Sequence, residues 1–257
     1  MVFGAEKLGL GTKPEMIVQR MDDQTAEEII SRKIDVKTIL GKIVNYEIFT
    51  SPVIESLARL VFELRENLLT YDTLISEDAG GRLPSLVLQK LINQERKKQG
   101  KETTSIYFIS GGHIRSPETE EAVTTFINNK KESLKKTLLV TEYIASGKSI
   151  RWLIETLEKH HIDFDVATVS IDLEPTNQDY SKELRDEFKK RLHYGSIGRS
   201  GLTFYGKHST SGVSRSYQDK FSPHPGRYRD RDRNPKQVVS VREDVTIIAK
   251  ELSKLLE

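Results

Sequence analysis

Residues 135–157 read KKTLLVTEYIASGKSIRWLIETL. The segment 137–141 is nearly all apolar, as is typical of a β-strand whose two faces are both covered by helices. After a short polar turn, apolar residues recur at the spacing of an amphipathic helix, at Ile150, Leu153, Ile154 and Leu157. The stretch therefore predicts a buried strand followed by a helix, which is the repeating unit of a parallel α/β fold.

The same alternation of strand and helix continues on both sides of this unit. Short β-prone runs lie at 73–78, 104–110 and 165–171, and helical patterns lie at 53–68, at 85–100 and from Pro117 onward. Gly100 is placed to end one helix as a C-cap, and Ser116 is placed to begin the next as an N-cap. The whole pattern predicts a doubly wound α/β fold, in which a parallel sheet lies between two layers of helices.

Composition divides the chain into three parts. Residues 1–50 are predicted to be an N-terminal extension, 51–192 the α/β core, and 193–257 a lobe rich in Gly, Ser and Arg that ends in a helix. Ser240 and Glu243 form a capping-box pattern for that last helix. Its buried stripe is predicted at Val241, Val245, Ile248, Leu252 and Leu255.

Composition also excludes several classes of protein. The 257 residues contain no cysteine, so disulfides, thiolate catalysis and cysteine-bound metals are excluded. The N-terminus lacks the apolar core of a secretory signal, and no apolar run is long enough for a membrane span, so we expect a cytoplasmic protein that does not enter the membrane. A formal net charge of +2 is too small to predict a nucleic-acid partner.

The triplet Gly147-Lys148-Ser149 matches the sequence at the end of a nucleotide-binding P-loop. That motif needs a glycine five positions before Gly147, so that a wide loop of backbone N–H groups can wrap a triphosphate. The position holds Glu142, whose carboxylate would repel the phosphates. An enzyme that hydrolyses ATP or GTP through a P-loop is therefore disfavoured.

A strand, an acid and a short turn at the start of a helix together suit a single phosphate attached to a sugar. The first backbone N–H groups of a helix have no partner within the helix and lie at the positive end of its dipole, so they bind phosphate. Glu142, just upstream, is placed to accept hydrogen bonds from sugar hydroxyls. The sequence thus predicts a sugar-phosphate site over residues 142–149.

The segment LLVTEYIASGKS, residues 138–149, resembles the binding signature of the type I phosphoribosyltransferases. In that signature an apolar strand runs into two acids, two apolar residues and a small Gly-containing turn. The resemblance covers about residues 50–175 and implies a phosphoribosyltransferase-like sheet. It implies that Thr141 and Glu142 contact the ribose of phosphoribosyl pyrophosphate. The implied 5-phosphate site consists of Ala145, Ser146, Gly147, Lys148 and Ser149.

Two further segments are similar to loops of that family in position and in their small, basic character: SEDAGGRLPSLVL at 76–88 and SGGHIRSP at 110–117. The Gly80-Gly81-Arg82 segment is predicted to be a turn before the helix that follows. The resemblance implies that Glu142 and Arg82 act in catalysis, with Arg82 steadying the leaving group. The implied pyrophosphate contacts are Asp78, Ala79, Gly80, Gly81, Arg82, Gly111, Gly112, His113 and Arg115.

The resemblance implies transfer of ribose 5-phosphate from phosphoribosyl pyrophosphate to a base or related nucleophile, with release of pyrophosphate. Mg²⁺ is the implied cofactor, and it is expected to be held mainly by the substrate rather than by a set of protein ligands. No sequence pattern identifies the acceptor, and a homodimer is left open.

The sequence departs from the family pattern at two places. Thr141 stands where the family has its first acid, so the alternative function is a non-catalytic regulator that binds phosphoribosyl pyrophosphate or a nucleotide. The helix predicted from Pro117 stands where many members have a long flexible lid, so the lid is either shortened to residues 111–116 or has been moved or lost.

Plainer interpretations stand beside these. The Gly-Lys-Ser turn could be an ordinary strand-to-helix connection, Arg82 could be a surface residue, and Trp152 is predicted to pack in the core. The segment 224–236, HPGRYRDRDRNPK, alternates Arg and Asp and is predicted to be a solvated loop, with an RNA or acidic partner as the alternative. Aromatic residues that could stack on a base are Tyr194, Phe204 and Tyr205.

Overall fold

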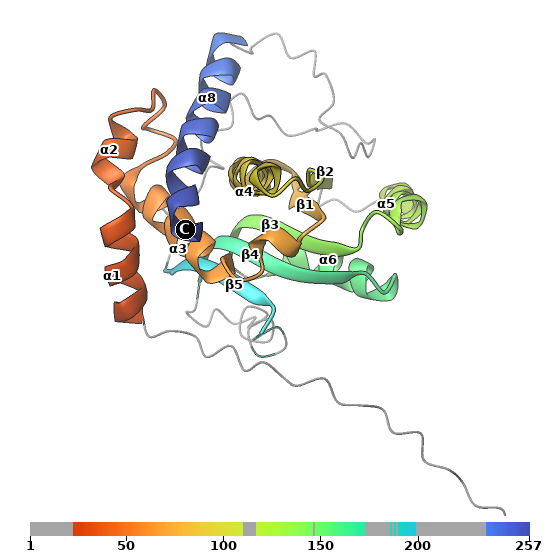
Figure 1. The fold of residues 1–257 in the computed structure, drawn as a ribbon. Coiled ribbons are helices and arrows are strands. Elements are labelled where there is room, and N and C mark those ends of the chain that lie inside the picture. Colours follow the sequence, from red (N-terminus) through yellow and green to blue (C-terminus); the bar gives the residue numbers. More distant parts are fainter. Residues whose placement is uncertain are drawn as a thin grey trace, which may run out of the picture.

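The computed structural model describes residues 23–109, 117–145, 147–172, 186, 188, 190–198 and 235–257. Its strands are β1 Thr73–Glu77, β2 Ser105–Ile109, β3 Lys136–Ile144, β4 Asp163–Ile171 and β5 Leu192–Ile197 (Figure 1). Its α-helices are α1 Asp23–Lys33, α2 Val36–Leu40, α3 Ser51–Leu64, α4 Asp78–Lys98, α5 Pro117–Lys130, α6 Lys148–Lys159 and α8 Pro235–Leu252. Two short 3₁₀ helices are η1 Leu68–Thr70 and η3 Ser253–Leu256.

The strands form one sheet in the order β2-β1-β3-β4-β5, and every neighbouring pair is parallel. Four of the strands were predicted from their apolar runs. The fifth, β5, was missed because its sequence LHYGSI is short, half polar and interrupted by Gly195. That glycine has a packing role, since a Cβ atom there would lie 2.0 Å from the Ser56 carbonyl oxygen of α3. The predicted α/β class with a parallel sheet is confirmed.

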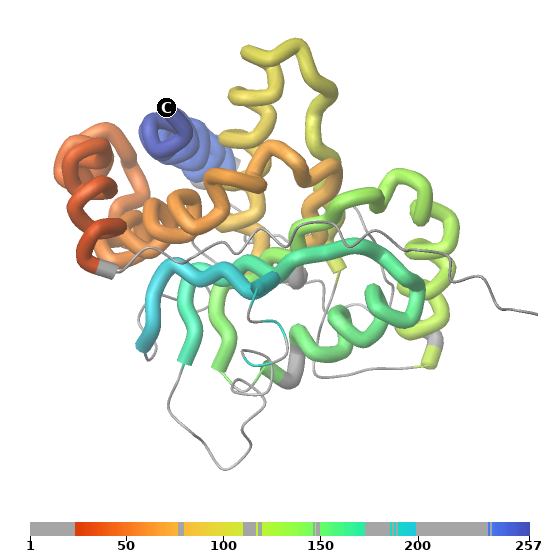
Figure 2. Tube along the Cα trace, turned by 60° about the horizontal axis from the view of Figure 1, so that its bottom comes forward, coloured from red at the N-terminus to blue at the C-terminus, as the bar shows by residue number. Residues whose placement is uncertain are grey.

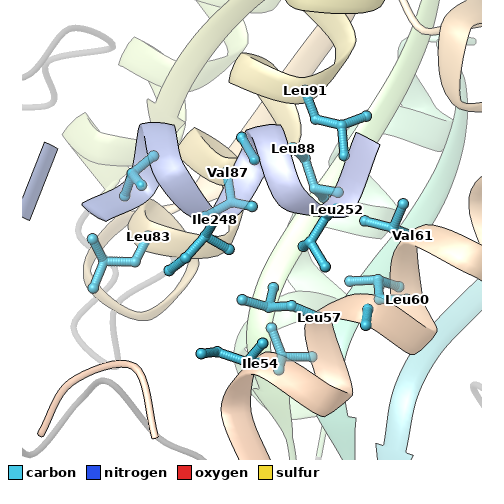
Figure 3. Packing of buried hydrophobic residues seen from close by; sticks show 14 of the residues in the cluster. Ile54, Leu57, Leu60, Val61, Leu83, Val87, Leu88, Leu91, Ile248 and Leu252 are labelled. Carbon is cyan, nitrogen blue, oxygen red and sulfur yellow. The ribbon is translucent and has the colours of Figure 1, made fainter. Parts of the chain in front are cut away.

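Helices cover both faces of the sheet. On one face α3, α4 and α8 share a core with β3 and β4, and Figure 3 shows Leu57, Leu88 and Leu252 meeting there. On the other face α5 and α6 bury a second cluster that includes Phe126 and Leu153. Figures 1 and 2 show α3 and α8 on one side of the sheet and α6 on the other. Trp152 is buried in the second cluster, as its helical spacing predicted.

The N-terminal helices are joined to the C-terminal helix by a buried carboxylate. Asp244 of α8 accepts hydrogen bonds from Val44 N at 2.9 Å and from Asn45 N and Nδ2 at 2.8 and 2.7 Å. The predicted start of this helix at Ser240 is wrong, because α8 begins at Pro235, a residue well suited to a first turn. The Ser240 hydroxyl instead accepts from Asn45 Nδ2 at 3.1 Å, so the capping-box pattern lies inside the helix.

The predicted division of the chain stays a prediction, although its second boundary can be placed in the structure. Leu192 is the first residue of β5, so residues 193–197 continue a strand of the sheet. Residues 23–50 supply Ile34, Ile39 and Phe49 to the same core as α3 and α8. None of the helices in the described ranges is long and apolar enough to cross a membrane.

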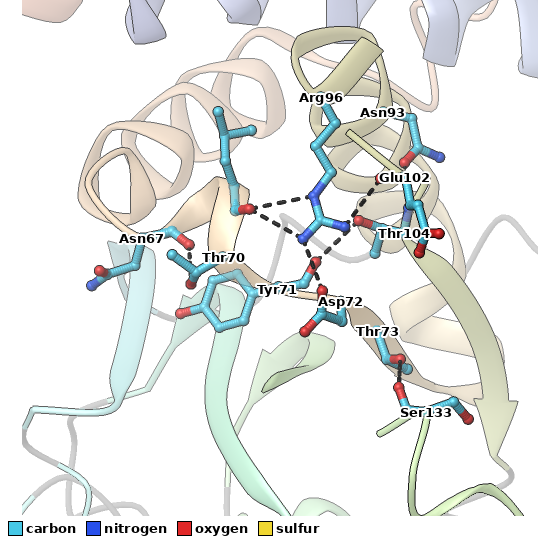
Figure 4. A network of polar contacts seen from close by, with 11 residues as sticks. Asn67, Thr70, Tyr71, Asp72, Thr73, Asn93, Arg96, Glu102, Thr104 and Ser133 are labelled. Atoms are coloured by element: carbon cyan, nitrogen blue, oxygen red, sulfur yellow. Dashed lines mark hydrogen bonds and ion pairs between the residues drawn. The ribbon is translucent and has the colours of Figure 1, made fainter. Parts of the chain in front are cut away.

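The amino edge of the sheet, where the strands begin, is held together by buried polar contacts (Figure 4). Arg96 of α4 donates to the Leu69 carbonyl at 3.1 and 3.3 Å, to the Glu102 carbonyl at 3.2 Å and to Asp72 at 3.2 Å. The α4 helix ends in a Schellman arrangement, in which Lys101 N donates to the Arg96 carbonyl at 2.9 Å and Gly100 has a φ of 66°. The predicted Gly100 cap is therefore confirmed.

A second network lies beside the first on the same edge. The Tyr71 hydroxyl donates to Asp165 at 2.7 Å, and Lys136 contacts the same carboxylate at 3.1 Å. Burial of the ring, and then the nearby negative charge of Asp165, raise the pKa of Tyr71 above its usual range. Arg191 approaches Asp165 at 3.7 Å and stacks over Phe164, with its guanidinium carbon 4.4 Å from the ring centre.

Candidate functional site

The candidate site lies where the strand order reverses. From β1 the chain passes through α4 to β2 on one side, and it then returns through α5 to β3 on the other side of β1. In open parallel sheets of this order, ligands bind beyond the carboxyl ends of the strands at that point. The carboxyl ends of β1 and β3 carry residues 78–82, which are predicted to contact pyrophosphate, and residues 142–149, the predicted sugar-phosphate site.

Helix α4 begins at Asp78, directly after β1, so the predicted Gly-Gly-Arg turn is wrong. Its first turn lies so close to the sheet that a Cβ atom at Gly81 would be 2.5 Å from the Val140 carbonyl oxygen and 2.7 Å from Ser76 Oγ. The low helix propensity of glycine is outweighed here by this close packing of helix on strand. Residues 78–82 are thus the first turn of a helix whose N–H groups begin at the carboxyl end of β1.

Glu142 lies in β3, beneath that first turn. Its side chain is 3% exposed, and a Cβ atom at Gly80 would lie 2.8 Å from Oε2 of Glu142. Val140, two residues earlier, belongs to the core on the α4 face, so Glu142 points to the same face. Gly80 therefore lets a carboxylate fit between β3 and the N-terminus of α4.

Thr141 is 2% exposed and precedes Glu142 within the same strand. Successive residues of a strand point to opposite faces of the sheet, so the Thr141 side chain faces away from α4. The structure thus separates the two residues predicted to contact the ribose, and only Glu142 lies beneath the first turn of α4.

The turn at 145–149, which we call the phosphate turn, leads from β3 into α6. Gly147 is the N-cap of α6 in the left-handed conformation, with φ 71°, which glycine adopts without the strain of a side chain. Because α6 starts directly after β3, the N–H groups of its first turn lie at the edge where the strands end. Ala145 is exposed; Ser146 and the side chains of Lys148 and Ser149 lie outside the described part.

Tyr143 and Asp172 are a pair at this edge that the sequence did not identify. The Tyr143 hydroxyl donates to Asp172 Oδ2 at 3.1 Å, and Asp172 N donates to the Ile144 carbonyl at 2.8 Å. The contacts fasten the last residues of β3 to the end of β4, next to the phosphate turn. An acid directly after the apolar strand at 165–171 is the same signal that identified Glu142, and it could have pointed to Asp172.

Arg82 lies on the β2 side of the switch point. Its guanidinium carbon is 5.0 Å from the centre of the Phe108 ring of β2, whereas Glu142 is on β3, and β1 runs between them. Arg82 and Glu142 thus approach the switch point from opposite sides of β1. Four further residues predicted to contact pyrophosphate lie outside the described part, and they are Gly111, Gly112, His113 and Arg115.

Comparison with known proteins gives little further guidance. No family model matches the chain, and no curated protein matches it. Among solved structures, it is similar to the crystal structure of orotate phosphoribosyltransferase from Aeropyrum pernix, with 13% sequence identity and a TM-score of 0.36. The match covers 67% of this chain and 93% of that chain. A score this low establishes neither family nor function.

Proposed function

We propose that the chain binds a sugar 5-phosphate at the β1/β3 switch point and acts as a phosphoribosyltransferase. One observation carries the proposal: the buried Glu142 carboxylate lies between the first turn of α4 and the strand that leads into the phosphate turn. Two helix N-termini and one carboxylate at the switch point offer hydrogen-bond donors for phosphates and an acceptor for hydroxyls. Phosphoribosyl pyrophosphate carries all of these groups.

Each part of the site has a proposed role. The backbone N–H groups of the phosphate turn bind the 5-phosphate, as the resemblance at 138–149 implies. Glu142 accepts a hydrogen bond from a ribose hydroxyl. The first turn of α4, residues 78–82, binds the pyrophosphate, and Arg82 neutralises charge on it as it departs. These roles agree with the positions of the two helix starts next to β1 and β3.

The proposed reaction is a substitution at the anomeric carbon of the ribose. The bond from that carbon to the pyrophosphate oxygen breaks, both electrons leave with pyrophosphate, and an acceptor nitrogen forms the new bond and gives up its proton. Developing positive charge on the sugar is relieved by negative groups, and charge on the leaving group by cations. In the described ranges, the His, Asp and Glu side chains form no group of three or more that could hold a metal. We propose that Mg²⁺ arrives on the pyrophosphate oxygens, as this ion often does on phosphates.

A non-catalytic regulator is the second candidate, and Thr141 favours it. A neutral residue stands where the family has its first acid, and its side chain points to the opposite face from Glu142. A binder of this kind would hold the ligand without turnover. Binding and pyrophosphate release therefore have to be measured separately.

The decisive experiment is calorimetric titration of the full chain with phosphoribosyl pyrophosphate, with and without Mg²⁺. Ribose 5-phosphate, ATP and GTP serve as comparators. We expect phosphoribosyl pyrophosphate to bind best, and more tightly with Mg²⁺ present. Equal or better binding of a triphosphate, or no binding at all, would contradict the proposal. A screen of bases for pyrophosphate release then distinguishes an enzyme from a regulator.

Glu142→Gln tests the ribose contact in the same assay. The amide keeps the shape of the side chain but loses the charge, so we expect affinity to fall by about tenfold, or about 1.4 kcal/mol. Glu251→Gln is the matched control, because Glu251 is also largely buried but lies on α8 and pairs with Lys42 and Lys254. Unchanged affinity in Glu142→Gln would show that the Glu142 carboxylate does not contact the ribose.

A further inference from the structure

The loops at the amino edge of the sheet lie side by side. Asp72 N donates to the Lys136 carbonyl at 2.9 Å, and Ser105 N donates to the Asp72 carbonyl at 3.1 Å, so the starts of β2 and β3 flank the start of β1. Lys136 also contacts Asp163 at 3.3 Å, which brings in the start of β4. The backbone bond from Val166 N to the Arg191 carbonyl, at 2.7 Å, adds the start of β5. Residues far apart in the sequence thus form one continuous edge.

Exposed lysines gather along this edge, and we call them the basic edge: Lys97, Lys101, Lys130, Lys131, Lys135, Lys159 and Lys190. Within the described ranges none of them makes an ion pair. Their other basic neighbours are already paired, Lys98 with Glu95 and Arg96 with Asp72. In the described ranges the exposed carboxylates on the same loops are fewer: Glu102, Glu132, Glu158, Asp163 and Asp186, of which Asp163 is paired with Lys136. The edge therefore carries a positive excess even though the whole chain is nearly neutral.

Helix dipoles account for only part of this excess. Lysines in the last turn of a helix complement its negative end, which explains Lys97, Lys130 and Lys159. Lys101, Lys131, Lys135 and Lys190 lie beyond the helix ends and need another explanation. The pKa of His160 lies below its usual range, first because the ring is partly buried and then because Lys159 and Lys131 are nearby. The second cause reflects the local positive charge.

We propose that the basic edge binds the phosphodiester backbone of a nucleic acid. Lysines act as mobile point charges that suit phosphates without reading bases. The strand starts from β2 to β5 span four spacings of about 4.8 Å, or roughly 19 Å, which is close to the axial rise of between five and six base pairs of a duplex at about 3.4 Å each. A lipid surface fits less well, because the large apolar side chains of high exposure in the described ranges, Val44, Tyr46, Ile197 and Val239, are not on these loops.

This inference goes beyond the proposed sugar-phosphate site and does not rest on it, because the two lie at opposite edges of the sheet. Clustering of the lysines is a property of the fold. The formal net charge of +2, which predicted no such partner, counts the same lysines without their positions.

Fluorescence polarisation of the full chain with labelled oligouridylate and a labelled DNA duplex tests the proposal. At about 50 mM salt we expect dissociation constants on the order of 10 μM, weakening steeply as salt rises. Lys131→Glu with Lys135→Glu should weaken binding by about tenfold and make the logarithmic salt slope shallower by about 2. Lys33→Glu with Lys250→Glu changes the net charge equally at exposed positions off this edge, and should weaken binding less than about threefold.

Four results would overturn the proposal. The first is no binding of either probe at low salt. The second is equal weakening by the two pairs of substitutions, because net charge alone would then explain the binding. The third is binding that survives the Lys131 and Lys135 changes and disappears with Arg229→Glu and Arg231→Glu, because the contact would then lie in 224–236. Vesicles of anionic lipid form a final arm, and equal capture of vesicles through Lys131 and Lys135 would assign the edge to membranes instead.

Discussion

The two edges of the sheet are built in different ways. At the amino edge, side chains satisfy one another: Arg96 binds two carbonyls and Asp72, and Tyr71 and Lys136 converge on Asp165. At the carboxyl edge, two glycines of α4 lie directly on β3, Gly81 against the Val140 backbone and Gly80 against the Glu142 side chain. Side-chain networks thus join the strand starts at the amino edge, whereas the carboxyl edge, apart from the Tyr143–Asp172 pair, accommodates a buried carboxylate beneath the N-terminus of α4. The following substitutions test that division.

The largest effect is expected from Gly81→Ala at the carboxyl edge. The new methyl group would lie 2.5 Å from a backbone oxygen that cannot turn away, so α4 must move off β3. We expect the free energy of unfolding to fall by about 3 kcal/mol, measured by urea denaturation. Gly41→Ala is the control, since Gly41 has a φ of −71° and its nearest atoms are at 3.5 Å. Equal losses in the two variants would show that the close approach of α4 is not a constraint.

At the amino edge, Arg96→Met should lower the free energy of unfolding by about 2 kcal/mol, because the Leu69 and Glu102 carbonyls and Asp72 lose their donor. Binding of phosphoribosyl pyrophosphate by the folded variant should be unchanged, since Arg96 lies at the edge opposite the site. Arg32→Met removes an exposed arginine 3.8 Å from Glu28 and should cost less than about 0.5 kcal/mol. Weaker binding of phosphoribosyl pyrophosphate by Arg96→Met would contradict the assignment of stability to the amino edge and of ligand binding to the carboxyl edge.

Gly80→Ala should reduce ligand affinity strongly and stability only slightly. Its methyl group would meet the far end of the Glu142 side chain at 2.8 Å, and that end can rotate away at a cost of about 1 kcal/mol in stability. The displaced carboxylate should reduce affinity for phosphoribosyl pyrophosphate by about tenfold, measured by calorimetry. An affinity loss in Gly81→Ala alone would mean that the position of α4, and not that of Glu142, controls binding.

The smallest effect concerns the pH dependence of stability. The raised pKa of Tyr71 favours its protonated form in the folded state, so its contribution is complete below about pH 10 and is lost as the pH rises above that value, where the unfolded tyrosine ionises. Thermal unfolding midpoints followed from about pH 9 to about pH 11 should therefore fall less steeply in Tyr71→Phe than in the parent. Tyr46→Phe, at an exposed position, should retain the parent slope. Identical slopes in all three proteins would show that Tyr71 does not cause the loss of stability at high pH.

Much of the fold could be predicted from local patterns. The apolar runs at 73–78, 104–110, 137–141 and 165–171 correspond to β1 to β4, and the stripe of the last helix is buried from Val241 to Leu255. Two predicted boundaries were wrong, one because a tertiary contact outweighed the local preference and the other because Pro235 offers an earlier helix start. Gly80 and Gly81 were predicted to form a turn but are helical, because they pack on β3. Ser240 was predicted to cap a helix but contacts Asn45 instead.

The α/β class, and the acid and glycine-containing turn after the third strand, could be predicted without a structure, because both depend on residue type and on spacing along a single segment. The tertiary structure was needed to establish the strand order, the burial of Glu142 beneath Gly80, the packing of Arg82 over Phe108 of β2, and the gathering of lysines at the amino edge. These features depend on which segments become neighbours. Neighbours are chosen by the burial of whole helix and sheet faces, a sum over many residues that no single motif contains.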